Sequence, residues 1–197
     1  MLAGNFRRNL ARVAAAGALL SLTSMAYGGP IADNAADAEA RAAAGDGAGA
    51  VAAFDAAADA FFDATPLTFR VATFADSVAG FGRYAPHAEG TAFKAGDAVT
   101  VYLEPVGYGF TRDGDGYRVS YGTGLEIRTP GGLILGKTDD FGTLSWSGRG
   151  KSLEVQAVVG ITLPSALKPG DYELLLTLKD DASQKSATVT LPFAIAE

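Results

Sequence analysis

Leu167-Lys-Pro-Gly-Asp-Tyr-Glu-Leu-Leu-Leu-Thr-Leu-Lys-Asp180 is the stretch that decides the fold of this 197-residue chain. Its Pro-Gly-Asp segment favours a turn, because proline presets φ, glycine adopts positive φ and aspartate bonds to nearby backbone. After the turn, apolar residues recur with the period of two that is typical of a strand with one buried face. This register predicts that Leu174 and Leu176 lie in a core and that Thr177 lies on the opposite face.

The same alternation recurs along the chain and predicts about eight strands. Apolar rows alternate in residues 67–74, 98–105, 153–163 and 187–195. The first row is expected to place Leu67, Phe69, Val71 and Thr73 on one face. Short strands separated by turns at this spacing are typical of a β-sandwich. We therefore expect residues 66–197 to form a mainly β domain, an immunoglobulin-like antiparallel β-sandwich.

The first 26 residues have the pattern of a secretory signal peptide. Three arginines precede a short apolar run at residues 13–22, and a small-x-small site predicts cleavage after Ala26. The run is too short for a good membrane span. The pair Arg7-Arg8 partly matches the twin-arginine export pattern, so both Sec and Tat export stay open. The pattern predicts a periplasmic or extracellular protein with no membrane span after signal cleavage.

Two segments separate this predicted signal peptide from the first strand. Residues 27–49 are rich in Ala and Gly and have almost no large apolar side chain, which predicts a flexible segment. In residues 50–65, Val51, Phe54 and Phe61 fall on one helical face. We expect an amphipathic helix there that packs on one end or edge of the sandwich. A partner-binding helix is the alternative.

Charge and cysteine content exclude several classes of function. The formal charge is -6, and removal of three arginines and no acid with the signal peptide would take it to -9. A protein this acidic is a poor partner for nucleic acid, whose phosphates require a basic patch. The chain has no cysteine, which excludes a thiol nucleophile, an iron–sulfur cluster and a Cys-ligated zinc.

Three short motifs look like functional loops but are better explained as turns or surface loops. Residues 80–85 have the letters G-x-G-x-x-A of a dinucleotide loop, yet Pro86 follows at once and no helix begins there. His87 is the only histidine and has no partners for a triad or a metal centre, so we expect a surface residue. Residues 113–116 begin like a calcium loop but lack its later glutamate. We expect no metal site and no cofactor.

One predicted strand end carries the clearest pattern of a binding site. Tyr102, Glu104 and Tyr108 combine aromatic rings with a carboxylate where a strand enters a loop, and loops on a rigid scaffold commonly form binding sites. Tyr84 and Trp146 could add aromatic contacts to a sugar or a peptide. The alternative is that the two strand-end tyrosines pack in the interior and Glu104 is merely the last exposed residue of its strand.

Six stretches carry a resemblance: Pro66-Leu-Thr-Phe69, Phe81-Gly-Arg-Tyr84, Phe93-Lys-Ala-Gly96, Val101-Tyr-Leu-Glu-Pro-Val-Gly-Tyr108, Pro169-Gly-Asp-Tyr172 and Leu191-Pro-Phe193. Together they resemble an uncharacterised family of exported proteobacterial proteins, over nearly all of residues 50–197. The Pro-Gly-Asp-Tyr strand alone is also similar to the penultimate strands of immunoglobulin-like modules. These resemblances imply export and a fold, and they assign no reaction, ligand or catalytic residue.

The sequence therefore predicts an exported, non-enzymatic interaction or ligand-binding module of the cell envelope. Its partner would be an unknown envelope protein or a small ligand. One alternative is a carbohydrate-active hydrolase that uses carboxylates near Glu104. Another is a subunit of a surface assembly, which would present an unpaired sheet edge or an exposed apolar groove.

Overall fold

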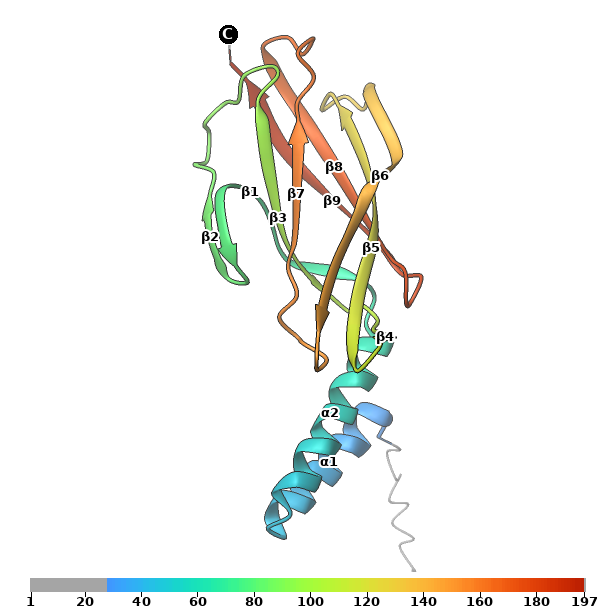
Figure 1. Ribbon diagram of the computed structural model, residues 1–197. Coiled ribbons are helices and arrows are strands. Elements are labelled where there is room, and N and C mark those ends of the chain that lie inside the picture. Colours follow the sequence, from blue (N-terminus) through green and yellow to red (C-terminus); the bar gives the residue numbers. More distant parts are fainter. Residues whose placement is uncertain (1–27, 197) are drawn as a thin grey trace, which may run out of the picture.

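The computed structural model describes residues 28–196 and consists of two antiparallel sheets with two helices at one end (Figure 1). The first sheet has the order β2-β1-β3-β7, with β1 (Thr68–Gly80), β2 (Arg83–Pro86), β3 (Ala98–Val106) and β7 (Ala157–Thr162). The second sheet has the order β4-β5-β8-β9, and β6 pairs with β5 as well. Its strands are β4 (Thr111–Asp113), β5 (Gly116–Arg128), β6 (Ile134–Gly148), β8 (Gly170–Asp180) and β9 (Ser186–Ile195). The predicted mainly β, antiparallel fold is confirmed, with nine strands among the described residues. The predicted signal peptide lies outside them.

Strand β8 has the predicted register. Leu174 and Leu176 are fully buried between the sheets, where they join side chains from β3, β5, β7 and β9 in one core. Thr177 points to the other face, where its hydroxyl lies 2.8 Å from that of Thr188 on β9. The register of a strand is fixed to the residue wherever one of its faces is buried and the other is not, because a shift by one residue would exchange the two faces.

Strand β1 departs from the predicted register after its second residue. Leu67 and Phe69 pack in or against the core as expected, but the core contacts then pass to Ala72 and Phe74. The pairing with β3 shifts between Phe69 and Val71, which is a β-bulge. The extra residue of the bulge turns every later side chain of the strand to the opposite face. The prediction that Val71 and Thr73 share a face with Leu67 and Phe69 was therefore wrong.

The segment predicted to be flexible contains a helix. Residues 27–49 include α1 (Pro30–Ala43) and the start of α2 (Gly47–Ala64), and the two helices pack side by side as a hairpin (Figure 1). Buried alanines on α2, Ala53 and Ala57, permit a close approach between helices that large side chains would prevent. Neither helix is long and apolar enough to cross a membrane, within the residues described.

The predicted apolar face of the second helix does not cover the sandwich. Val51 and Phe54 are 62% and 61% exposed, because the hairpin extends away from the sheets (Figure 1). Only the end of α2 reaches the core, where Phe62 packs edge-on against Tyr108 with ring centroids 4.9 Å apart. Lys185 holds this end in place: its Nζ donates to the carbonyl oxygens of Phe62 at 2.6 Å and Thr65 at 2.8 Å. A cation at a helix C-terminus satisfies carbonyls that the helix leaves free.

Candidate functional site

Three of the predicted site residues form a buried unit that holds the β1–β2 hairpin onto β3. The Gly82 N–H donates to the Tyr102 hydroxyl (2.8 Å), and that hydroxyl donates to Glu104 Oε1 (2.7 Å). Tyr84 stacks on Tyr102 with ring centroids 4.2 Å apart. Tyr102 lies on the outer face of the first sheet, yet it is fully buried because the hairpin covers it. We call this unit the Tyr102 latch.

The latch gives Glu104 a structural role. Glu104 is only 5% exposed, and its hydrogen-bond partner is the Tyr102 hydroxyl. Burial and the bond to Glu104 raise the pKa of Tyr102 to about 12, so the hydroxyl remains a donor at neutral pH. A carboxylate enclosed in this way does not offer a general acid or base to a substrate, and Glu104 lies outside the clefts described below.

Tyr108 is a core residue. It is 1% exposed, and its hydroxyl donates to the backbone carbonyl of Ser152 at 2.7 Å. Burial raises the pKa of Tyr108 above its ordinary value. The ring contacts Phe62 of α2, so Tyr108 joins the helix, the end of β3 and the segment before β7. The structure thus supports the packing alternative for Tyr102 and Tyr108.

Trp146 is the predicted site residue that lines a cleft. This β6–β7 cleft has a volume of about 500 Å³ and lies between the two sheets, at their β6 and β7 edges. Phe81, at the tip of the β1–β2 hairpin, lines it together with Trp146 and Leu144. Polar side chains in the lining are Ser145, Glu154 and Gln156. The cleft therefore combines aromatic surface with hydrogen-bonding groups, a composition that small-ligand sites share.

Tyr121 also lines the β6–β7 cleft and has an unsatisfied hydroxyl. The residue is 2% exposed, and its hydroxyl is buried with no hydrogen-bond partner among the described residues. Burial raises the pKa of Tyr121 well above its ordinary range, so the group stays protonated. A buried hydroxyl without a partner costs about 1–3 kcal/mol, and such groups in native proteins usually have an explanation.

A second cleft lies on the opposite side of the sandwich, between β1 and β9. This β1–β9 cleft has a volume of about 590 Å³ and is bounded by the loop after β2 and by parts of β1, β8 and β9. His87 lines it, with Nδ1 2.7 Å from Asp76 Oδ1 and its ring stacked on Phe93 at 4.3 Å. His87 was expected to be an ordinary surface residue, but its Nε2 is buried and has no partner within the described chain.

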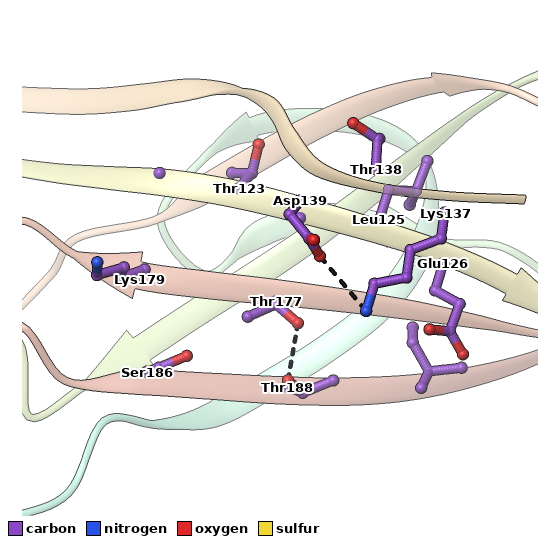
Figure 2. Close-up of a pocket in the computed structure, with 13 residues that line it drawn as sticks. Thr123, Leu125, Glu126, Lys137, Thr138, Asp139, Thr177, Lys179, Ser186 and Thr188 are labelled. Carbon is purple, nitrogen blue, oxygen red and sulfur yellow. Dashed lines mark hydrogen bonds and ion pairs between the residues drawn. The ribbon is translucent and has the colours of Figure 1, made fainter.

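The outer face of the second sheet carries a shallow groove of about 410 Å³ (Figure 2). Figure 2 shows two pairs among its polar side chains: Lys137 with Asp139 (3.4 Å) and Thr177 with Thr188 (2.8 Å). Gly122 leaves open space on this face, which hollows it. Polar side chains on an open sheet face are ordinary sandwich surface, and none of them is a buried group without a partner, so this groove is a weaker candidate than the two clefts.

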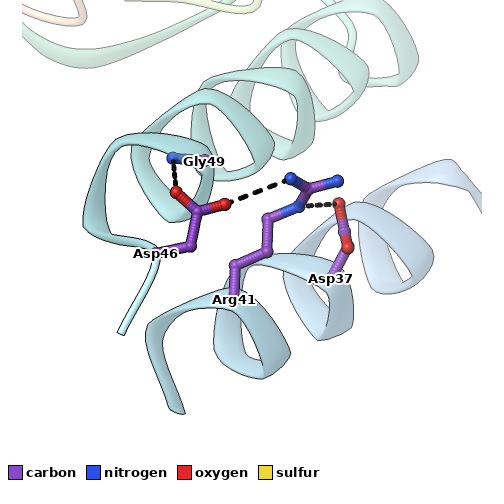
Figure 3. A network of polar contacts seen from close by, with 4 residues as sticks. All are labelled: Asp37, Arg41, Asp46 and Gly49. Carbon is purple, nitrogen blue, oxygen red and sulfur yellow. Dashed lines mark hydrogen bonds and ion pairs between the residues drawn. The ribbon is translucent and has the colours of Figure 1, made fainter. Parts of the chain in front are cut away.

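Three aspartates outside the clefts stabilise turns and helix ends. Asp180 is fully buried and accepts from the backbone N–H of Gly109 at 2.7 Å and from that of Ser183 at 3.1 Å, which fixes the turn after β8. In the helical hairpin, Arg41 pairs with Asp37 at 2.8 Å, and Asp46 caps α2 by accepting from the Gly49 N–H at 2.9 Å (Figure 3). Across residues 28–196, no three His, Cys, Asp or Glu side chains are grouped to hold a metal ion.

Sequence reasoning missed most of the residues that line the two clefts. Phe81, Tyr121 and Gln156 come from three distant segments, and only the fold brings them beside Trp146. The usable signal was composition: a lone tryptophan and a lone histidine on an otherwise regular sandwich. Neither signal identifies which neighbours the residue meets, because those depend on how the sheet edges face each other.

Comparisons with known proteins add little to this picture. No family model and no curated protein matches the chain. Among solved structures, the crystal structure of the C-terminal domain of wzt is similar at 16% sequence identity, over 67% of this chain and 74% of that chain, with a TM-score of 0.39. A likeness at this level carries no argument about function.

Proposed function

We propose that the protein is a non-catalytic binding module of the cell envelope that takes a sugar-type, polyhydroxylated ligand in the β6–β7 cleft. The observation that carries the proposal is that Tyr121, whose buried hydroxyl has no partner among the described residues, lines the same cleft as the single tryptophan. Envelope localisation is the other part of the proposal, and it rests on the signal-peptide pattern of residues 1–26.

The lining suits a ligand that is apolar on its ring faces and polar around its rim. Trp146 and Phe81 offer aromatic surface against which the C–H face of a sugar ring can pack. Glu154 and Gln156 can accept and donate hydrogen bonds to ligand hydroxyls. The Tyr121 hydroxyl already loses its contact with water when the protein folds. A ligand hydroxyl that reached it would add a hydrogen bond without a further desolvation cost at this group, which favours binding.

The tryptophan is held by its own strand. The end of its ring lies over Gly148, where an added Cβ would come within 2.5 Å of the indole Cη2. Glycine at this position therefore lets the ring lie flat along β6. A pre-positioned aromatic ring loses less conformational entropy on binding than a mobile one.

The lone tryptophan makes the binding proposal directly testable by intrinsic fluorescence. Soluble hexasaccharides of glucose, mannose and N-acetylglucosamine would be titrated into the purified chain, with calorimetry on the variants. We expect at least one to change Trp146 emission saturably, and Trp146→Ala and Tyr121→Phe to weaken its binding. Phe141→Ala, on an exposed side chain of the same strand outside the cleft, is the control. Emission that stays constant with all three sugars, or equal binding by the cleft variants, would overturn the assignment.

The export part has its own experiment. A fusion of residues 1–30 to a periplasmic reporter is expected to cross the inner membrane and to be cleaved after Ala26. N-terminal sequencing of the exported product measures the cleavage site. An intact N-terminus or a cytoplasmic reporter would contradict export without bearing on the ligand cleft.

A surface-assembly subunit is the second candidate, and one observation favours it. Among the described residues, strand β6 pairs with β5 alone. Leu133 just before it and Ile134 and Leu135 at its start are 66%, 51% and 46% exposed. An unpaired edge beside apolar side chains is a template for β-augmentation. Light scattering on the purified chain and on Leu135→Lys tests it: concentration-dependent association that this variant abolishes would support assembly through β6.

A further inference from the structure

The β1–β9 cleft has an aromatic lining. Phe74 and Phe93 meet edge to face with centroids 5.1 Å apart, and Tyr172 stacks on Phe193 at 5.6 Å. All four rings line the cleft together with the ring of His87. Aromatic faces carry negative electrostatic potential, so a cluster of them attracts a cation as well as an apolar group.

The charged side chains of this lining are all acidic. Glu89, Asp171 and Glu173 line the cleft, and its lining contains no Lys or Arg. Glu173 is already paired with Arg128 at 2.7 Å. Glu89 and Asp171 are exposed and form no ion pair within residues 28–196. Two free carboxylates beside aromatic faces disfavour an anionic ligand and favour a cationic one.

His87 adds a hydrogen-bond acceptor. An ionised Asp76 carboxylate can only accept, so its 2.7 Å contact with Nδ1 places the ring proton of a neutral imidazole on that nitrogen. Nε2 then carries a lone pair, and this atom is buried without a partner. A buried acceptor of this kind calls for an N–H or O–H donor.

We propose that the β1–β9 cleft binds a small organic ammonium ion that carries N–H donors and an apolar body. The apolar body lies against Phe93 and Phe193, and the ammonium group bonds to His87 Nε2 and to the carboxylates of Glu89 and Asp171. Each part of the ligand follows from one observation. The apolar body matches the aromatic lining, the positive charge matches the acidic side chains, and the N–H donors match the unpartnered nitrogen of His87. This site is independent of the sugar site proposed for the β6–β7 cleft.

Four matched probes separate these contributions. They are 2-phenylethylammonium, its N,N,N-trimethyl derivative, 2-phenylethanol and phenylacetate, titrated into the purified chain and followed by ¹H–¹⁵N NMR shifts of β1 and β9. We expect 2-phenylethylammonium to bind at least about tenfold more tightly than the alcohol, a difference of about 1.4 kcal/mol, and phenylacetate to bind most weakly. The trimethyl derivative keeps the charge but has no N–H donor, so it should bind more weakly than the primary ammonium.

Variants locate the contributions on the protein. The pair Glu89→Gln with Asp171→Asn changes two exposed side chains, which should leave the fold intact and weaken ammonium binding at least about tenfold without changing that of the alcohol. His87→Phe keeps the stacking on Phe93 and should reduce the preference for the primary over the trimethyl ammonium, because one of the three acceptors of its N–H groups is lost. Asp140→Asn, which changes an exposed carboxylate on β6 that lines neither cleft, is the control. Equal binding of alcohol and ammonium, no effect of the double variant, or no binding of any probe would overturn the proposal.

Discussion

The two clefts lie on opposite sides of the sandwich and are covered by different segments, and these segments determine which side chains line each cleft. At the β6–β7 cleft, a hairpin tip brings Phe81 next to the edge strand that carries Trp146. At the β1–β9 cleft, the long loop after β2 brings His87 against Phe93, beside Phe74 of β1 and Phe193 of β9. Each cleft is lined by one of the two residues that carry a buried side-chain atom without a partner in the described chain: Tyr121, through its hydroxyl, and His87, through Nε2. The sheets supply a common core, and the covering segments supply the specificity.

The largest effect is expected from the core that both clefts share. Leu176→Ala removes a fully buried side chain from β8 and should lower the free energy of unfolding by about 2–5 kcal/mol, the range for truncating a buried leucine. Thr177→Ala, on the opposite face, loses only a hydroxyl pair with Thr188 and should cost less than about 1 kcal/mol. Urea unfolding of both variants measures this. A Thr177 variant that is the less stable of the two would reverse the assigned faces of the strand.

A smaller effect, confined to one cleft, is expected from the Tyr102 latch. Tyr102→Phe leaves the Glu104 carboxylate and the Gly82 N–H without their partner, which should cost about 1–3 kcal/mol near neutral pH. The hairpin tip that carries Phe81 would loosen, so the β6–β7 cleft should change while the β1–β9 cleft does not. NMR shifts on the two sides measure the difference, and equal disturbance of both clefts would argue against a local latch.

The latch also predicts a pH dependence. The pKa of Tyr102 is raised from 10.0 to about 12 in the folded protein, so folding favours its protonated form. The stabilisation is fully present below pH 10 and is lost as the pH rises through about 12. The stability difference between the wild type and Tyr102→Phe should therefore shrink between these two pH values. Urea midpoints across that window provide the measurement, and a constant difference would mean that the hydroxyl is not held as described.

Gly148→Ala should act on the β6–β7 cleft alone. An added Cβ would meet the Trp146 ring at 2.5 Å, so the ring must turn away from β6. Because a side chain rather than backbone has to move, the cost should lie at the lower end of the about 1–3 kcal/mol typical of overpacking. The clearer readout is a shift in tryptophan emission. Gly160→Ala on β7, where a Cβ meets nothing within 4 Å, is the control and should leave emission unchanged.

The sequence predicted what depends on local periodicity and missed what depends on the approach of distant segments. The alternation in β8 and β9 was enough to assign the core row that contains Leu176, because turns flank β8 and join it to β9. The β1 row was predicted only as far as Phe69, since a bulge leaves no clear mark in the residues. Alanine-rich residues 30–43 have a single large apolar side chain, Ile31, yet they pack on α2 because alanine permits a close approach between helices.

The candidate site residues show the same contrast between local pattern and the approach of distant segments. Aromatic residues at a strand end predicted Tyr102 and Tyr108 as ligand contacts, but a strand end also serves as packing surface wherever another segment folds over it. The β1–β2 hairpin and α2 do this here. Trp146 lines a cleft because β6 is an edge strand, and edge position is a property of the topology rather than of the residue.

The smallest effect on stability, and the most specific for the comparison between clefts, is expected from Tyr121→Phe. Its hydroxyl has no partner, so its removal relieves an unsatisfied buried group and should leave the free energy of unfolding unchanged or slightly higher. Tyr108→Phe is the matched variant: that hydroxyl donates to the Ser152 carbonyl, and its loss should cost about 0.5–1.5 kcal/mol. Urea unfolding compares the two variants, and calorimetry with the hexasaccharide that binds the wild type shows whether Tyr121→Phe weakens binding without loss of stability. If Tyr121→Phe destabilises the protein as much as Tyr108→Phe does, the hydroxyl is already satisfied in the free protein, and the β6–β7 cleft loses the feature that distinguishes it as a ligand site.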